Sequence, residues 1–131
     1  MDSFWARAAV LATLIVVAAA AGLWRRRVDG RARAVTGGTQ VTSDELGQTL
    51  GRRATLLQFS APVCAPCRAA RRVLAEVAAT VPDVAHVEVD AAEHLALVRR
   101  LAVLRTPTVL VLDADGQVAA RTSGVPTRAQ V

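Results

Sequence analysis

The sequence predicts an α/β domain with a mixed central sheet flanked by helices, preceded by a single N-terminal transmembrane helix. Three patterns lead to this prediction: a strand, helix and strand between residues 55 and 90, a hairpin near the C-terminus, and a long uncharged segment at the N-terminus. The chain has 131 residues and no internal repeat, so its soluble part suffices for one small domain.

The central unit opens with a short apolar and β-branched run over residues 55–60, which predicts a buried strand. Apolar residues recur on one helical stripe from residue 65 to residue 80 and predict an amphipathic helix. Residues 84–90 read as the next strand. Two strands joined by such a helix form a right-handed parallel crossover.

Shorter elements surround this unit. A capped helix is predicted over 43–50, and a second helix over 92–102, with Asp90 helping to cap its start. Two apolar runs, 108–112 and 117–122, flank a turn sequence and predict a hairpin. The sheet is therefore expected to be mixed, parallel at first and then antiparallel.

Cys64 and Cys67, the two cysteines of the chain, stand where the first strand gives way to the helix, with Pro66 in the first turn. Unpaired N–H groups and the helix dipole favour a thiolate there, so we expect a lowered pKa for Cys64. Cys67 returns to the same helical face and is expected to be the more buried, resolving thiol. The spacing predicts a reversible dithiol that exchanges with disulfides through a mixed disulfide.

Two other interpretations of this pair stay open. A zinc site would need about four ligands, and only His86 and His94 are available besides the cysteines. A purely structural disulfide would close a loop too short to restrict the unfolded chain much. We therefore predict neither a metal nor another cofactor.

The order of elements, the Cys64-Ala65-Pro66-Cys67 motif and Thr106-Pro107 about forty residues later together resemble the thioredoxin family, from about Val41 to the end. The resemblance implies a thioredoxin-like fold, a cis bond before Pro107, and activity as a thiol–disulfide oxidoreductase on protein substrates. It also implies a substrate groove beside the dithiol, formed by Ala65, Pro66, Thr106, Pro107 and Gly124.

The chain departs from the family pattern at several positions. Val63 replaces the tryptophan that precedes the first cysteine, and Gln58 corresponds to a buried aspartate that assists proton transfer from the resolving thiol. An amide cannot act as that base. His86 corresponds to a nearby lysine and has an unperturbed pKa near neutrality. We therefore hypothesise that His86, with Gln58, forms a proton relay for Cys67, although a histidine in a strand is more often a packing residue.

The family fold also ends in a helix that covers one face of the sheet. Only seven residues follow Gly124 here, and a helix of barely one turn is not stable alone. We expect the final helix to be missing or shortened, with part of a sheet face uncovered.

Residues 1–27 are predicted to be a transmembrane anchor that contacts the membrane through residues 4–27. The segment 8–24 carries no charge, and Trp5 and Trp24 stand near its two ends, as in an interfacial belt. A cleaved signal peptide is the main alternative, but it would have a shorter apolar region and would not be followed at once by Arg25, Arg26 and Arg27. Residues 28–40, with three glycines, are predicted to be a flexible linker to a domain over 41–131.

The charge pattern predicts the orientation. Residues 1–40 carry six Arg and two Asp, a net charge of +4, whereas residues 41–131 carry ten Arg and nine acidic residues, a net charge of +1. Most of the arginines near the anchor follow it, so the positive-inside rule places the domain on the cytoplasmic side of a bacterial cell membrane. The overall charge of +5 reflects this topology and anionic headgroups, so no nucleic-acid partner is predicted.

The function predicted from these observations is a membrane-anchored thiol–disulfide oxidoreductase. Its partners would be protein disulfides or dithiols and an upstream electron donor. Two alternatives stay open: a redox-inactive thioredoxin-like binding module tethered to the membrane, and an extracytoplasmic reductase for cytochrome c maturation.

Overall fold

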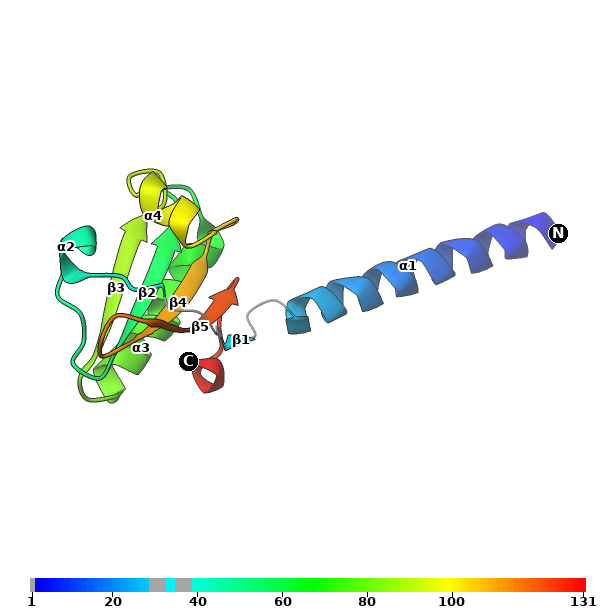
Figure 1. The fold of residues 1–131 in the computed structure, drawn as a ribbon. Helices are drawn as coiled ribbons and strands as arrows, with labels where there is room; N and C mark the ends of the chain where they lie inside the picture. The colour runs from blue at the N-terminus through cyan, green and yellow to red at the C-terminus, as the bar shows by residue number, and fades with distance from the viewer. Residues whose placement is uncertain (1, 29–32, 35–38) are drawn as a thin grey trace.

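The computed structural model describes residues 2–28, 33–34 and 39–131. These described residues form ten elements (Figure 1). In order they are α1 (Asp2–Val28), β1 (Arg33–Ala34), α2 (Ser43–Leu46), β2 (Ala54–Ser60), α3 (Ala65–Thr80), β3 (Val84–Asp90), α4 (Leu95–Arg100), β4 (Thr108–Asp113), β5 (Val118–Ser123) and the 3-10 helix η1 (Arg128–Gln130).

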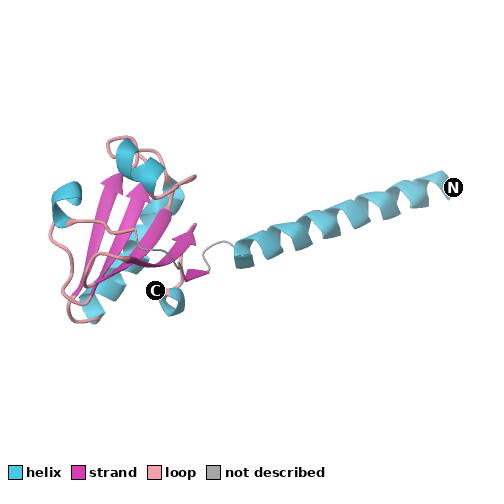
Figure 2. Ribbon diagram, viewed as in Figure 1, coloured by secondary structure: helices cyan, strands magenta, loops and turns pink. Residues whose placement is uncertain are grey.

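The strands form one mixed sheet in the order β1-β5-β4-β2-β3 (Figure 2). β2 and β3 are parallel, in the register Gln58 opposite Glu88, and their connection through α3 is the predicted crossover. The pairs β2·β4, β4·β5 and β1·β5 are antiparallel. The predicted fold class, with a mixed sheet and flanking helices, is confirmed.

Side chains alternate between the two faces of the sheet, so each face has its own apolar core. On one face, Leu56 and Val109 pack with Leu74 of α3. The opposite face holds the larger core, which includes Leu57 and Phe59 together with residues of α2 and α4. The helix that follows the cysteine motif thus lies on one side of the sheet, and the shorter helices lie on the other.

α3 forms where the sequence predicts it. Cys64 is its N-cap, in extended backbone geometry, and Pro66 lies in its first turn. Ala70 and Leu74 on the predicted stripe are buried, while the arginines between them are exposed. Since β2 ends at Ser60, this helix starts at the carboxyl edge of the sheet and holds the cysteine pair there.

Two short helices differ from the sequence prediction. α4 begins at Leu95 rather than residue 92, because the Asp90 carboxylate accepts the N–H of Ala92 and closes a turn instead of capping a helix. α2 ends at Leu46 rather than residue 50, because Gly47 takes left-handed geometry there. Its N-cap is Thr42.

The N-terminal helix α1 is long and apolar enough to cross a membrane over Arg7–Trp24, where its mean hydropathy is 1.9 and its residues are exposed. Figure 1 shows it apart from the sheet. The predicted flexible linker 28–40 lies mostly outside the described residues. Within it, Arg33–Ala34 form the short strand β1, which pairs with β5. The sequence analysis did not predict β1.

At the other end of the chain, the residues after Pro126 form the single turn η1. This turn lies against α3, and Val131 packs on the apolar cluster around Leu56, Leu74 and Val109. The predicted shortened element is thus a single turn, and it lies on the same side of the sheet as α3.

Candidate active site

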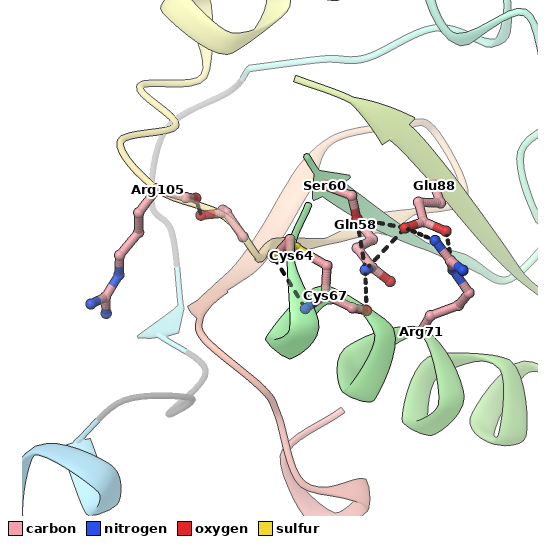
Figure 3. Close-up of a disulfide and its surroundings, with 8 residues drawn as sticks. Gln58, Ser60, Cys64, Cys67, Arg71, Glu88 and Arg105 are labelled. Atoms are coloured by element: carbon pink, nitrogen blue, oxygen red, sulfur yellow. Dashed lines mark hydrogen bonds and ion pairs between the residues drawn. A yellow bond between two sulfur atoms is a disulfide. The ribbon is translucent and has the colours of Figure 1, made fainter. Parts of the chain in front are cut away.

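The candidate active site is built around a disulfide between Cys64 and Cys67 at the N-terminus of α3 (Figure 3). The sulfur atoms are 2.05 Å apart and the Cα atoms 5.2 Å apart. The backbone N–H of Cys67 donates a hydrogen bond of 3.2 Å to Cys64 Sγ. This N–H is one of the unpaired donors of the first helical turn, so it can stabilise negative charge on Cys64 when the disulfide opens.

The two cysteines differ in exposure. Cys67 is 1% exposed, whereas Cys64 is half-buried and is followed by two exposed residues, Ala65 and Pro66. Cys67 is thus the more buried of the two cysteines, as the sequence analysis expected.

The Thr106–Pro107 bond is cis, as the family resemblance implied. The N–H of Gly124 donates to the carbonyl oxygen of Pro107 at 2.8 Å, so these two predicted groove residues lie side by side. Thr108 Oγ1 donates to the carbonyl of Arg105 at 2.7 Å and fixes the loop that leads into Pro107. Figure 3 shows this loop running from Arg105 towards Cys64, on the other side of the disulfide from Glu88.

Exposed apolar residues adjoin these segments. Val63, directly before Cys64, is 97% exposed, and Leu104, shortly before Pro107, is 93% exposed. Val125 follows Gly124 and is also exposed. Each segment that contributes a predicted groove residue thus carries an apolar side chain open to solvent.

The predicted pair Gln58 and His86 is in direct contact. His86 Nε2 lies 3.0 Å from Gln58 Oε1, so the ring donates its proton to the amide oxygen. Gln58 is fully buried, and its amide Nε2 donates to the backbone carbonyl of Cys67 at 2.9 Å. The structure thus connects Gln58 to the backbone of Cys67, and His86 to Gln58.

Three residues that the sequence prediction did not select complete this network. Gln58 Nε2 donates to Ser60 Oγ at 2.9 Å, and Ser60 donates to Glu88 Oε1 at 2.5 Å. Glu88 also binds Arg71 of α3 through two contacts, at 2.5 and 2.9 Å. A cleft of about 270 Å³ beside these residues opens to solvent and is lined by Ser60, Ala61, Pro62, Arg71, Glu88, Val89 and Asp90.

The charges of this network shift its titratable groups. Hydrogen bonds from Arg71 are the main cause that lowers the pKa of Glu88 below its usual value, against the opposing effect of burial. Burial lowers the pKa of His86, although the nearby Glu88 carboxylate acts in the opposite direction. At neutral pH, Glu88 is therefore charged and His86 is neutral.

The sequence contained a signal for Glu88 and Arg71. Residues 58 and 60 of one strand and 86 and 88 of the next share the face that α3 covers, since side chains alternate with period two. Arg71 lies four positions after Cys67 and thus on the same side of the helix. The register between β2 and β3 places Glu88 opposite Gln58 and so brings Gln58, Glu88 and Arg71 together.

Metal ligation has little support in the part of the chain that the structure describes. There, no three histidine, cysteine, aspartate or glutamate side chains lie close enough together to hold an ion. The two candidate histidines are engaged elsewhere, His86 with Gln58 and His94 with the carbonyl of Asp90.

Comparison with known proteins agrees with the fold. The family model described as Thioredoxin matches residues 39–131. This chain belongs to the thioredoxin family. Among curated thioredoxins, thioredoxin H5 of Oryza sativa subsp. japonica is 35% identical over 66 residues, which are 50% of this chain and 49% of that protein. The chain thus spans about half the length of this curated relative.

Solved thioredoxins have similar structures. Oxidised mitochondrial thioredoxin 3 from Saccharomyces cerevisiae superposes with a TM-score of 0.53 and 26% identity, over 60% of this chain and 73% of that one. Chloroplastic thioredoxin z gives a TM-score of 0.57 and 25% identity, over 75% of this chain and 90% of that one. The thioredoxin fold therefore accounts for most of the chain outside α1.

Proposed function

We propose that this thioredoxin-family protein is a membrane-anchored thiol–disulfide oxidoreductase that acts on protein disulfides or dithiols. The observation that carries the proposal is the Cys64–Cys67 pair, with the half-buried Cys64 as N-cap of α3 and the buried Cys67 within bonding distance. A cysteine pair that opens and closes in this position needs no other cofactor for exchange.

In the reducing direction, the thiolate of Cys64 attacks a substrate disulfide, and one substrate sulfur leaves as a thiolate. The Cys67 thiolate then attacks Cys64 Sγ of the mixed disulfide, releases the second substrate sulfur and forms the Cys64–Cys67 bond. Two electrons pass from the protein to the substrate, and an upstream donor must return them. The same steps in reverse oxidise a dithiol.

The proposed substrate groove consists of Ala65, Pro66, Thr106, Pro107 and Gly124. Its support is the hydrogen bond between Gly124 and Pro107 and the exposure of Val63 and Leu104 beside these segments. Apolar side chains next to a reactive sulfur can hold an extended peptide segment while the sulfur atoms exchange.

The membrane part of the proposal rests on residues 1–27 as a single-pass anchor, 28–40 as a linker and 41–131 as the redox domain. The length and hydropathy of Arg7–Trp24 support a spanning helix. The arginines that follow it favour a cytoplasmic domain in a bacterial cell membrane. An impermeant maleimide should then label the reduced protein in inverted vesicles but not in intact spheroplasts, and the opposite pattern would favour the extracytoplasmic reductase.

The exchange activity is tested by trapping. Replacing the resolving thiol (Cys67→Ser) should leave Cys64 joined to substrates as mixed disulfides that survive non-reducing electrophoresis and disappear with dithiothreitol. Cys64→Ser is the matched control and should trap nothing. If Cys67→Ser traps no more protein than Cys64→Ser does, the redox-inactive binding module becomes the better account.

For the proton transfer, we propose that His86 and Gln58 act as a relay for Cys67. The support is the chain of contacts from His86 to Gln58 and from Gln58 to the Cys67 backbone. His86→Gln should slow the resolution of a preformed mixed disulfide several-fold, most strongly near neutral pH. An unchanged resolution rate at every pH would remove His86 from the mechanism.

A further inference from the structure

A hydrogen-bonded group lies between strands β2 and β3 and the first turns of α3 (Figure 3). It consists of Gln58, Ser60, Arg71 and Glu88 and is here called the Glu88 cluster. Through Gln58, this cluster connects a charged pair to the backbone of Cys67. Gln58 and Ser60 are buried, and the Glu88 side chain is 23% exposed. The Glu88 carboxylate therefore interacts over several ångströms more strongly than a surface charge does, whereas the Arg71 side chain is 53% exposed and its charge is partly screened.

We propose that Glu88 is a positioning residue for Cys67, and that the balance of charge between Glu88 and Arg71 sets how readily the Cys67 thiol loses its proton. The proposal rests on the thiol–disulfide exchange proposed above. Glu88 lies opposite Gln58, on the neighbouring strand β3. Its charge influences the resolving thiol in a way that the uncharged Gln58 cannot.

The contacts give the carboxylate a short path to Cys67. Gln58 Nε2 donates to the Cys67 carbonyl at 2.9 Å and lies 3.4 Å from Glu88 Oε1. Ser60 Oγ accepts from the same amide and donates to the same carboxylate oxygen. One side chain therefore separates the charge from the backbone of the buried cysteine, and the carboxylate holds that side chain in its orientation.

The groups that face Glu88 come from three elements. α3 contributes Arg71, β2 contributes Gln58 and Ser60, and β3 contributes His86 and, along the cleft, Asp90. With His86 neutral, the Arg71 guanidinium is the cation bound to the carboxylate. Removing either member of this ion pair leaves the other charge uncompensated beside Cys67.

The step affected is the resolution of the mixed disulfide. The Cys67 thiol gives up its proton, which reaches water through the proposed relay of Gln58 and His86, and its thiolate attacks Cys64 Sγ. The Cys64–Cys67 bond forms as the bond between Cys64 and the substrate breaks, and the departing substrate thiolate takes up a proton from water. A negative charge near Cys67 disfavours the thiolate, and a positive charge favours it.

Two substitutions in the full chain, held in detergent micelles, should therefore act in opposite directions. Glu88→Gln leaves Arg71 uncompensated, so it should shift the equilibrium with glutathione towards the reduced protein by about tenfold, as expected for one partly screened charge at this range. Arg71→Gln leaves Glu88 uncompensated and should shift the equilibrium towards the disulfide by a similar factor. The pH profile of mixed-disulfide resolution should move to lower pH in Glu88→Gln and to higher pH in Arg71→Gln.

Matched controls separate charge from structure. Arg72→Gln removes the same charge from the neighbouring, exposed position of α3, and should change the equilibrium less than twofold. Arg71→Lys keeps the charge and should restore an equilibrium close to that of the unmodified protein. Loss of stability would lower the melting temperature of several variants together and would not reverse the sign of the redox shift.

The proposal is overturned if Glu88→Gln and Arg71→Gln shift the glutathione equilibrium in the same direction, if neither shifts it, or if Arg72→Gln shifts it equally. These results differ from a failure of the proposed function. In that case the unmodified protein itself would show no two-thiol transition in the glutathione series.

Discussion

At the scale of single residues, Ala102 has a backbone conformation that its side chain disfavours. It follows α4 with a φ of 48°, in the left-handed region where glycine is the usual residue. The N–H of Val103 donates to the carbonyl of Val98 at 2.9 Å, which closes the end of the helix around Ala102. Arg121 of β5 donates to the carbonyl oxygens of Leu101 and Ala102 and thereby ties this end to the sheet.

Replacing this residue with glycine (Ala102→Gly) should stabilise the protein by about 0.5–1 kcal/mol, because relief of the left-handed strain exceeds the added entropy of the unfolded chain. The free energy of unfolding by urea measures the effect. A decrease would mean that Ala102 is not strained in solution.

Some residues of the candidate site can be predicted from the sequence, and others cannot. Cys64, Cys67 and Pro107 can be selected from the sequence by residue type and spacing; in the structure the cysteines form a disulfide and the bond before Pro107 is cis. Glu88 and Arg71 cannot be selected in this way, because an acidic residue in a strand and an arginine on a helix are usually only solvated. Their pairing depends on strand register and helix placement, which no local pattern specifies.

At the scale of elements, the strands and α3 follow the sequence prediction to within about one residue, because each carries a clear apolar period. The short elements follow it less well. The two residues of β1 are too few to show any period, and their pairing depends on the free edge of β5. The helix predicted from residue 92 starts later, because one Asp90 hydrogen bond favours a turn.

The N-terminal cap of α2 makes the stability of the fold depend on pH. The Glu45 carboxylate accepts the N–H of Thr42 at 2.9 Å and pairs with Arg100, which follows far along the chain, at 2.6 Å. Hydrogen bonds from Arg100 first, and from Thr42 second, lower the pKa of Glu45 from 4.5 to about 2. Since the pKa falls on folding, this carboxylate stabilises the fold fully above about pH 4.5 and loses the effect as the pH falls towards 2.

Glu45→Gln should therefore reduce the free energy of unfolding at pH 7 by about 1 kcal/mol, a modest value because the side chain is about one-third exposed. The difference from the unmodified protein should shrink below pH 4.5 and vanish near pH 2. Urea unfolding at a series of pH values measures it. A difference that stays constant with pH would show that the carboxylate charge does not contribute.

At the scale of the whole molecule, the chain joins an exposed apolar helix to a thioredoxin domain whose own charge is close to neutral. The net charge lies mainly around the helix, so the sequence alone indicated a membrane contact and gave no basis for a nucleic-acid surface. The two-sided core of the domain, with α3 on one face and α2 and α4 on the other, leaves the cysteine pair at the carboxyl edge of β2.

The central claim is that Cys64 and Cys67 form a working redox pair, and a glutathione titration tests it most directly. The full chain in detergent is equilibrated in graded redox buffers, and alkylated thiols are counted by mass. We predict one cooperative two-thiol transition, with a potential between about −270 and −120 mV, the range of thioredoxin-like reductants and oxidants. Thiols that stay reduced throughout, or that titrate independently of each other, would contradict the account.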